Sequence, residues 1–439
     1  MSEIIYSKKI REKYNVDVCI VGGGPSGIAA AVSAARSGVS VFLAESQGFF
    51  GGLATTALVP AFMPFTNGVD FLAGGVGKEI YDLCLENKFY LSGRTVGIHM
   101  EKYKLICDNL ITKEKNINYS FFTTLIDVIK SGEKSSRVDY AIFNAKSGIF
   151  AVKAKIYIDC SGDGDLCAFA GNSYVIGDDS GKTMPTTLCS VWSDINWNDK
   201  NFSDSEQLEK AFENQVFTQE DRHLSGMWRI GENLGGGNIG HSFDVDATDE
   251  VSLTKAMLTG RKILPEYEKY YREYLSRGYK NASVAITGSY LGVRESRRIS
   301  GDYELSINDF INRASFNDEI GRFSYPIDIH IANPDKESYE KFRKEHDTMR
   351  YKDGESYGIP YRILLPKDLS NVYVAGRCAS TDKKMQSSIR VMPACFIMGQ
   401  ATGLGAALAI KNNCETREIN IAELQQNLIN IGAFLPNVR

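Results

Sequence analysis

Histidine is the first residue type in this chain that could do chemistry, because its ring takes up protons near neutral pH. The 439-residue sequence contains five, at positions 99, 223, 241, 330 and 346. His330 follows the extended run Tyr325–Ile329, and His241 lies in a glycine-rich stretch. We predict that one of these two acts as a base that takes a hydroxyl or amine proton. The alternative for either residue is a hydrogen-bonded structural or surface histidine.

Arginine is the second such residue type. Arg294, Arg297 and Arg298 form a dense basic cluster, and Arg390 lies just ahead of a predicted helix. The planar guanidinium forms paired hydrogen bonds with carboxylates. We therefore predict a functional role for at least one of the clustered arginines, Arg294 first, and for Arg390 by the same reasoning. The alternative is ion pairing with neighbours such as Glu295.

A glycine turn near the N-terminus predicts a dinucleotide site. Gly22-x-Gly24-x-x-Gly27 follows an apolar run and precedes an alanine-rich segment. In such a turn the first glycine permits the bend, the second lets the backbone approach a pyrophosphate, and the third allows close helix–strand packing. The pyrophosphate binds the free N–H groups at the helix start. Glu45, which ends the next apolar run, is predicted to accept hydrogen bonds from ribose hydroxyls.

These residues require a sheet and helices to position them. Val16–Val21, residues 25–37 and Val39–Ala44 have the patterns of a strand, a helix and a second strand, which together form a βαβ unit. Further predicted elements are extended segments at 121–130 and 138–143 around the turn Ser131–Ser136, buried strands at Ala154–Asp159 and Asn371–Ala375, and a helix at 393–411. The alternation of strands and helices predicts an α/β fold with a parallel sheet.

Several segments resemble motifs of flavoproteins. They are SQGFFGGLAT at 46–55, IDCSGDGD at 158–165, NVYVAGR at 371–377, and SIRVMP at 388–393 ahead of GQATG at 399–403. GVRESRRISGDY at 292–303 and YPIDIH at 325–330 complete the order. On these motifs the chain resembles the FAD-dependent oxidoreductase family, in the glutathione-reductase-like flavoprotein superfold and the group with AGRC and RVMP signatures. The resemblance covers about residues 15–410.

This resemblance implies a split, three-layer Rossmann-like FAD-binding domain, at residues 1–174 and 351–439, with an inserted α+β substrate domain at 175–350. It implies that the following residues bind FAD: Gly22, Gly24, Pro25, Ser26, Gly27, Glu45, Ser46, Gly51, Gly52, Leu53, Thr55, Ser161, Gly162, Asp163, Gly376, Arg377, Cys378, Val391 and Pro393. The late helix would aim its positive end at the flavin N1/O2 edge. Arg377 departs from the pattern, since many such proteins have an aspartate there.

Cys378, directly after Gly376 and Arg377, leaves three interpretations open. The thiol could anchor the flavin covalently, serve as a redox group, or be a small buried side chain. A second glycine pattern, Gly235-x-Gly237-x-x-Gly240, lacks a preceding apolar strand and a following apolar helix, so we predict a flexible loop there. Asp244, Asp246 and Asp249 are predicted to form a helix-capping turn rather than a metal site.

The activity implied by the resemblance is hydride transfer between flavin N5 and a small organic substrate. A clustered arginine could then bind either a substrate carboxylate or the reduced flavin anion. The nine cysteines form no C-x-x-C pair, so we expect a diffusible electron donor or acceptor instead of a thiol or iron–sulfur relay. The alternatives are a flavin-dependent monooxygenase and a flavoprotein-fold binding protein that has lost catalysis.

Composition limits the partners further. Fifty Lys and Arg against 54 Asp and Glu give a net charge of −4, which disfavours a nucleic-acid partner. No run of 18 apolar residues and no signal-like N-terminus is present, and the cysteines are scattered and odd in number. We therefore expect a cytoplasmic protein without a membrane span. The sequence does not predict an oligomeric state.

Overall fold

The computed structural model describes residues 4–132, 134–199, 205–223, 226–275, 277–333, 335–346 and 349–438. Its centre is a seven-stranded sheet whose strands follow the order β6-β2-β1-β9-β8-β7, with β20 paired to β9 beside β8. These strands are β6 (Ile117–Ser120), β2 (Val41–Ala44), β1 (Arg11–Val21), β9 (Gly148–Asp159), β8 (Val138–Ala145), β7 (Thr123–Lys130) and β20 (Val372–Val374). The pairs joining β6, β2, β1, β9 and β20 are parallel, whereas β8 and β7 are antiparallel. The predicted α/β fold is thus confirmed.

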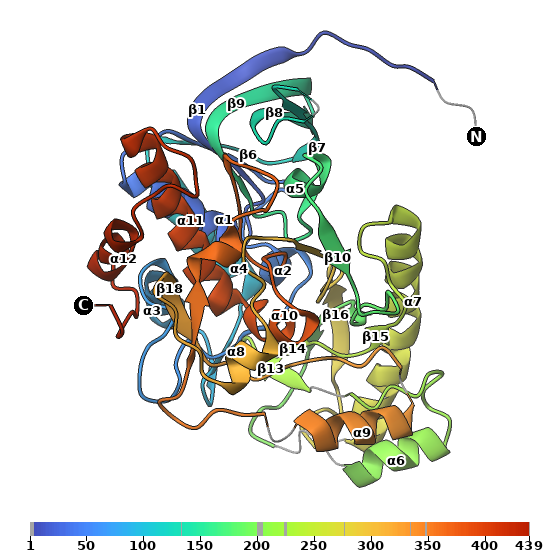
Figure 1. Ribbon diagram of the computed structural model, residues 1–439. Coiled ribbons are helices and arrows are strands. Elements are labelled where there is room, and N and C mark those ends of the chain that lie inside the picture. The colour runs from blue at the N-terminus through green and yellow to red at the C-terminus, as the bar shows by residue number, and fades with distance from the viewer. Residues whose placement is uncertain are drawn as a thin grey trace.

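The parallel part of the sheet (β6, β2, β1, β9 and β20) is the middle of three layers, because successive side chains of a strand point to opposite faces. Val18 and Ile20 pack against the helices of one layer. Cys19 and Val21 pack against the β7–β8 hairpin and α5 on the other face. The helices of the first layer are α1 (Pro25–Arg36), α3 (Val76–Glu86), α4 (Met100–Thr112), α11 (Met392–Asn412) and α12 (Ile421–Asn430). Helix α5 (Asp165–Phe169) lies on the other face. In Figure 1, α1 and α11 lie together beside the sheet.

Glycines allow α1 and α11 to pack closely. A Cβ at Gly399 would lie 2.2 Å from the Ser26 carbonyl oxygen, and one at Gly403 would lie 2.3 Å from that of Ala30. The described residues include one helix long and apolar enough to cross a membrane, α11, but 94% of its apolar window is buried inside the fold. Such burial is typical of a core helix.

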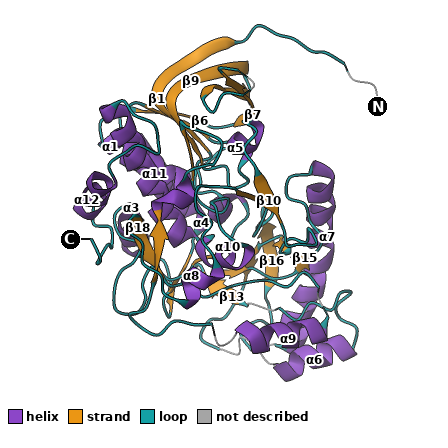
Figure 2. Cartoon of the chain, in the orientation of Figure 1, coloured by secondary structure: helices purple, strands orange, loops and turns teal. Residues whose placement is uncertain are grey.

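A second core lies under a four-stranded antiparallel sheet of order β13-β14-β12-β16. Its elements are β12 (Ser190–Ser193), β13 (Met227–Arg229), β14 (Gly235–Gly237), β16 (Ser283–Thr287), α6 (Ser205–Glu213), α7 (Glu250–Lys269) and a π-helical turn (Tyr270–Tyr274). Beside it, β11 (Thr186–Thr187) pairs with β15 (His241–Ser242). Figure 2 shows α6 and α9 (Lys336–His346) at the end of the molecule away from β1 and β9, with α7 along one side above them. Asp249 caps α7 by accepting a hydrogen bond from Ser252 N (2.7 Å), as predicted.

The prediction of a flexible loop at Gly235–Gly240 is wrong for its first half. Gly235–Gly237 form β14, a fully buried inner strand between β13 and β12. A Cβ at Gly236 would lie 2.3 Å from Pro60 Cβ, and one at Gly237 would lie 2.8 Å from Trp192 Nε1. The glycines are therefore required by close packing. A strand, β15, follows rather than a helix, so no second dinucleotide turn is formed.

The later part of the predicted insertion shares the first core. Leu305, Phe310 and Ile320 are buried in the same cluster as α1 and α11. The connecting elements are β10 (Tyr174–Ile176) with β17 (Arg297–Ile299), β18 (Glu319–Phe323) with β19 (Tyr357–Pro360), β3 (Ala61–Phe62) with β5 (Thr95–Gly97) and β4 (Leu91–Ser92), α2 (Leu53–Thr56), α8 (Ile307–Ile311), a 3-10 turn (Tyr361–Leu364) and α10 (Lys383–Ile389). The boundary at residues 175–350 stays a prediction.

Candidate active site

A cavity of about 490 Å³ opens where the parallel strands end. The residues that follow these strands line it: Gly22 after β1, Glu45 after β2, Cys160 after β9 and Ala375 after β20. Ligands of open α/β sheets bind at this edge. The same cavity continues to Arg294 and His330, so a group bound at the strand ends lies in one space with the predicted catalytic residues.

The glycine turn has the geometry of an anion site. Gly22 has a φ of +98°, and a Cβ there would lie 2.4 Å from the Cys160 carbonyl oxygen. Gly27 packs so tightly that its Cβ would lie 1.8 Å from the Gly22 oxygen. Gly24 is the N-cap of α1 and no side chain caps this helix. The first N–H groups of α1 are therefore available to a phosphate in the cavity.

A second glycine loop packs against the first. Gly52 and Leu53 line the cavity, and a Cβ at Gly52 would lie 2.8 Å from Gly24 Cα. Two backbones approach this closely only without side chains. Gly51 and Thr55 lie outside the cavity wall, where Thr55 Oγ1 donates a hydrogen bond to the Phe50 oxygen (2.9 Å) and supports the loop.

Glu45 is held at the cavity by backbone donors. Its carboxylate accepts hydrogen bonds from Gly23 N and Gln47 N, both 2.8 Å long, and from Ser46 Oγ (3.2 Å). Burial raises the pKa of Glu45, while these hydrogen bonds oppose the rise. Glu45 and Ser46 both line the cavity, so the carboxylate predicted to bind ribose is fixed in position before any ligand arrives.

The ends of β9 and β20 are joined by an ion pair. Arg377 donates to Asp163 Oδ1 and to Ser296 Oγ, both at 2.9 Å. Arg377 and Asp163 line the cavity together with Ser161, Gly162 and Gly376. Beneath them Asp159 is fully buried and accepts a hydrogen bond from Ser161 Oγ (2.7 Å). The departure at position 377 thus places a guanidinium at the cavity wall with its charge partly matched by Asp163.

Cys378 lies behind this wall. Its side chain is fully buried in the core between the parallel strands and the β7–β8 hairpin, and it does not line the cavity. Burial, with the nearby Asp159 carboxylate, raises the pKa of the Cys378 thiol well above its usual value. A neutral, enclosed thiol is a poor nucleophile. Of the three interpretations, this placement supports the small buried side chain and not a covalent flavin anchor.

A second helix directs its N-terminus at the cavity. Val391 is the N-cap of the 21-residue α11, and no side chain caps this helix either. Val391 and Met392 line the cavity, whereas Pro393 lies in the first turn behind them. The positive end of α11 therefore faces the cavity.

Two histidines and an aspartate form a hydrogen-bonded chain that ends at the cavity, and a third histidine packs against it. Asp221 Oδ1 lies 3.1 Å from His241 Nδ1, and His241 Nε2 lies 3.0 Å from His330 Nδ1. The His223 ring packs on that of His330 with centroids 4.2 Å apart. His330 and His223 line the cavity, whereas His241 lies behind them.

With a neutral His241 ring, the chain selects one tautomer of His330. The Asp221 carboxylate only accepts hydrogen bonds, so His241 Nδ1 carries a proton and, in the neutral ring, His241 Nε2 is an acceptor. His330 Nδ1 then donates to His241, which leaves a lone pair on His330 Nε2. That nitrogen is 3.7 Å from Asp328 Oδ1. His330 can therefore take a proton at Nε2, and Asp328 would stabilise the charge that forms.

Both cavity histidines are neutral near pH 7. Burial lowers the pKa of His330 well below its usual value, and the Arg294 guanidinium and the His223 ring lower it further, with Asp328 opposing. Burial and His241 lower the pKa of His223 to about 4. A base must be unprotonated to accept a proton, so His330 is in the reactive form.

Arg294 is a buried cation with neutral partners only. Its side chain donates to Pro185 O and Thr187 Oγ1 (both 2.9 Å) and to Asn238 Oδ1 (3.0 Å). Burial and the nearby Arg390 lower its pKa to about 10, so it stays charged at neutral pH. Arg294 lines the cavity and is 4% exposed.

Arg390 in contrast has a carboxylate partner. Its Nη2 donates to the Asp328 carboxylate (3.0 Å) and to the Asp328 carbonyl oxygen (3.1 Å). Burial would raise the pKa of Asp328, but His330 and Arg390 hold it below its usual value. Arg390, Asp328 and Tyr325 all line the cavity. The structure thus brings together all four residues predicted to be catalytic, with His241 acting through His330.

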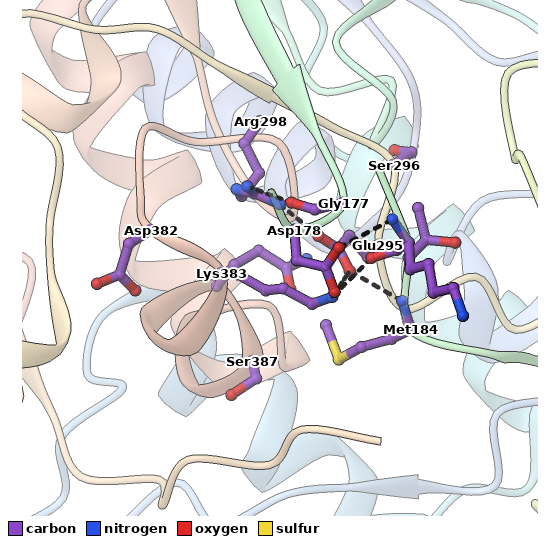
Figure 3. Close-up of polar contacts among 12 residues, drawn as sticks. Gly177, Asp178, Met184, Glu295, Ser296, Arg298, Asp382, Lys383 and Ser387 are labelled. Carbon is purple, nitrogen blue, oxygen red and sulfur yellow. Dashed lines mark hydrogen bonds and ion pairs between the residues drawn. The ribbon is translucent and has the colours of Figure 1, made fainter. Parts of the chain in front are cut away.

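A polar cluster beside α10 supports the segment that carries Arg294 (Figure 3). Glu295 is fully buried, forms an ion pair with Arg298, and accepts a hydrogen bond from Met184 N (2.9 Å). The Nζ atom of Lys383, on α10, lies 3.9 Å from Glu295 Oε2 and 3.1 Å from Asp178 Oδ2. The charge of Glu295 is therefore satisfied by its own neighbours rather than by Arg294.

The same helix also fixes the histidine segment. Gln386 Nε2 donates to the Arg294 carbonyl oxygen (2.8 Å), and Ser387 Oγ accepts from Asp328 N (3.0 Å). Helix α10 thus sets the spacing between Arg294 and the segment that carries His330.

Sequence reasoning did not select Asp221, His223 or Asp328. Asp328 precedes His330 by two residues in an extended run, where alternate side chains share a side, so its position was a usable signal. Asp221 and His223 lie in an irregular polar segment whose approach to His330 depends on tertiary packing. Among the described residues, no group of three or more His, Cys, Asp or Glu is arranged to hold a metal ion.

Comparison with known proteins identifies the family. A family model described as FAD dependent oxidoreductase matches residues 17–428. The chain belongs to the FAD-dependent oxidoreductase family. The residues around the cavity fit FAD, because two uncapped helix N-termini, two interlocked glycine loops and the anchored Glu45 carboxylate face one space. This FAD-dependent oxidoreductase has no match among curated proteins.

Three solved structures are similar to this oxidoreductase, and the first of them shares its fold. The p-nitrophenol 4-monooxygenase of Pseudomonas putida has a TM-score of 0.51 at 10% identity, over 95% of this chain and 85% of the other. A geranylgeranyl bacteriochlorophyll reductase-like protein of Thermoplasma acidophilum has a TM-score of 0.48 at 13% identity, over 95% and 83%. The L-proline dehydrogenase of P. horikoshii has a TM-score of 0.44 at 11% identity, over 97% and 100%.

Proposed function

We propose that this FAD-dependent oxidoreductase oxidises a small organic substrate by removing a hydride from carbon, while His330 takes the proton of the attached hydroxyl or amine. The observation that carries the proposal is the Asp221–His241–His330 chain, whose last member, His330, lines the cavity. Bound FAD supplies the two-electron acceptor for the hydride.

Each residue of the chain has a distinct part. His330 accepts the proton at Nε2, and Asp328 stabilises the imidazolium at 3.7 Å. His241 accepts the hydrogen bond from His330 Nδ1 and so holds the ring in the reactive tautomer. Asp221 fixes His241 in turn, and also accepts a hydrogen bond from His241 N (3.0 Å). His241 and Asp221 are therefore positioning residues, and His330 is the catalytic base.

We further propose that the electrons pass to a diffusible acceptor and that the protein is cytoplasmic. The nine cysteines contain no C-x-x-C pair, and the second glycine pattern forms a strand instead of a dinucleotide turn. All nine cysteines are free thiols, which suits a reducing compartment.

The proposal is tested first on the purified protein by its visible spectrum and by acid precipitation. We expect a flavin spectrum and release of all flavin to solution, since Cys378 lies behind the cavity wall. Anaerobic bleaching across sugars, hydroxy acids and amines then finds a substrate. Consumption of NAD(P)H and oxygen with a hydroxylated product would instead show a monooxygenase.

His330→Gln tests the base directly. We expect the rate of flavin bleaching to fall by about 10²–10⁴-fold, with FAD content unchanged. His99→Gln is the matched control, because His99 does not line the cavity. The wild-type rate should decline as the pH falls through the pKa of His330, which lies below 6.5, and this decline should be absent from the variant. An unchanged rate in His330→Gln would show that His330 is not the base.

A further inference from the structure

The arginines around the cavity have carboxylate partners except one. Asp163 pairs with Arg377 (2.9 Å) and Asp328 with Arg390 (3.0 Å). Asp165 likewise pairs with Arg297 (2.8 Å), and the Glu45 carboxylate accepts backbone hydrogen bonds. Arg294 alone among the cavity arginines forms no ion pair with a described residue. An unmatched charge in a buried site is costly unless a ligand supplies the counter-charge.

The guanidinium of Arg294 also retains hydrogen-bonding capacity. Its three hydrogen bonds go to a carbonyl, a hydroxyl and an amide oxygen, whereas a guanidinium has five N–H groups. Within the described part of the chain the remaining two N–H groups have no acceptor. A planar anion at this end of the cavity would accept hydrogen bonds from these two N–H groups of Arg294.

The flanking structure excludes an internal partner. Glu295, the adjacent residue, is turned away toward Arg298 and Lys383 and is fully buried there (Figure 3). Asp328 is already bound by Arg390. The described chain therefore offers Arg294 no carboxylate of its own, and the cavity beside it is open to a ligand.

We infer that the substrate is a hydroxy acid or an amino acid whose carboxylate binds Arg294. This inference rests on the proposed function, because the hydroxyl or amine of the same molecule is the group that His330 deprotonates. Arg294 thereby determines specificity: it selects acids over neutral alcohols and amines, and it turns the reacting end of the molecule toward the histidines.

The experiment compares acids with their amides on the purified holoenzyme. Glycolate, lactate and alanine are titrated against glycolamide, lactamide and alaninamide, with the dissociation constant read from the flavin spectrum. A charged hydrogen-bonded pair contributes about 1.5–3 kcal/mol, so each acid should bind about 10–100-fold more tightly than its amide. Arg294→Gln should abolish this preference while FAD stays bound at full occupancy.

Asn238→Asp is the second variant, because it brings a carboxylate to the guanidinium at an existing 3.0 Å contact without changing the side-chain shape. It should weaken acid binding about tenfold or more, and leave amide binding unchanged. Asn118→Asp makes the same chemical change at an exposed position of β6 and should leave the acid preference intact.

Three binding results would overturn the inference, and one kinetic result would also reject it. The binding results are equal binding of acids and amides by the wild type, an acid preference that survives in both cavity variants, and no spectral response to any acid. Faster bleaching by neutral alcohols or amines than by acids would reject it while leaving the base His330 in place. If acids bind more tightly than amides but His330→Gln bleaches the flavin at the wild-type rate, the proposed function is rejected and the inference about Arg294 is not.

Discussion

The two neutral cavity histidines make folding sensitive to acid, and His223 allows the effect to be calculated. Burial lowers its pKa from 6.5 in the unfolded chain to about 4 in the fold. Between these values the unfolded state binds one more proton than the folded state. Stability is therefore fully present above pH 6.5 and falls as the pH decreases from 6.5 toward 4.

The expected loss follows from the linkage relation. One pKa unit corresponds to about 1.4 kcal/mol, so moving from pH 7 to pH 5 removes about 2 kcal/mol through His223 alone. His330 contributes with the same sign, because its pKa is also lowered. The His223→Gln variant lacks this titrating imidazole. Its free energy of unfolding should therefore fall by about 2 kcal/mol less than that of the wild type between pH 7 and pH 5.

Urea unfolding followed by tryptophan fluorescence measures this difference. Trp192, Trp197 and Trp228 are the three tryptophans of the chain, and they lie in or against the cores around the four-stranded sheet. His99→Gln is the control: burial also lowers the pKa of His99, but less than that of His223, so its removal should change the pH dependence less. Parallel curves for wild type and His223→Gln between pH 7 and pH 5 would show that His223 is not held neutral.

The remaining predictions concern the cofactor turn and the histidine chain. Gly22→Ala should lose FAD, measured as the ratio of flavin to protein absorbance, because its Cβ would lie 2.4 Å from Cys160 O; Gly38→Ala has a similar positive φ but open space around its Cβ and should retain FAD. Asp221→Asn should lower kcat about tenfold or more through loss of a charged hydrogen bond to His241, with KM and FAD content little changed; an unaffected kcat would show that the carboxylate does not hold the relay.

The parts of the fold that the sequence predicts are those governed by local pattern. Val16–Val21 and Ala154–Asp159 are mostly apolar runs followed by glycine or polar residues, and both belong to parallel inner strands with their ends at the cavity. The helix predicted at 393–411 differs by one residue at each end from α11, Met392–Asn412. In each case the residues that determine the element lie within it.

The wrong prediction and the missed site residues occur where the local structure depends on residues that are distant in the sequence. The glycines at 235–237 have the composition of a loop, and only the packing of Pro60 and Trp192 against them explains a buried strand. Asp221 and His330 are more than one hundred residues apart in the sequence, and His241 joins them only in the fold. No local pattern predicts which of several polar residues will meet.

The charge of Arg294 and the basicity of His330 are linked by the geometry of the cavity. In the free site the guanidinium lowers the pKa of His330, together with burial and the His223 ring, against Asp328. His241 and Arg390 complete the charged and titratable groups around this ring. A carboxylate bound to Arg294 would offset its charge and so raise the affinity of His330 Nε2 for a proton. The base would then strengthen only when an acid is bound in position, so that substrate selection and proton removal depend on the same contact.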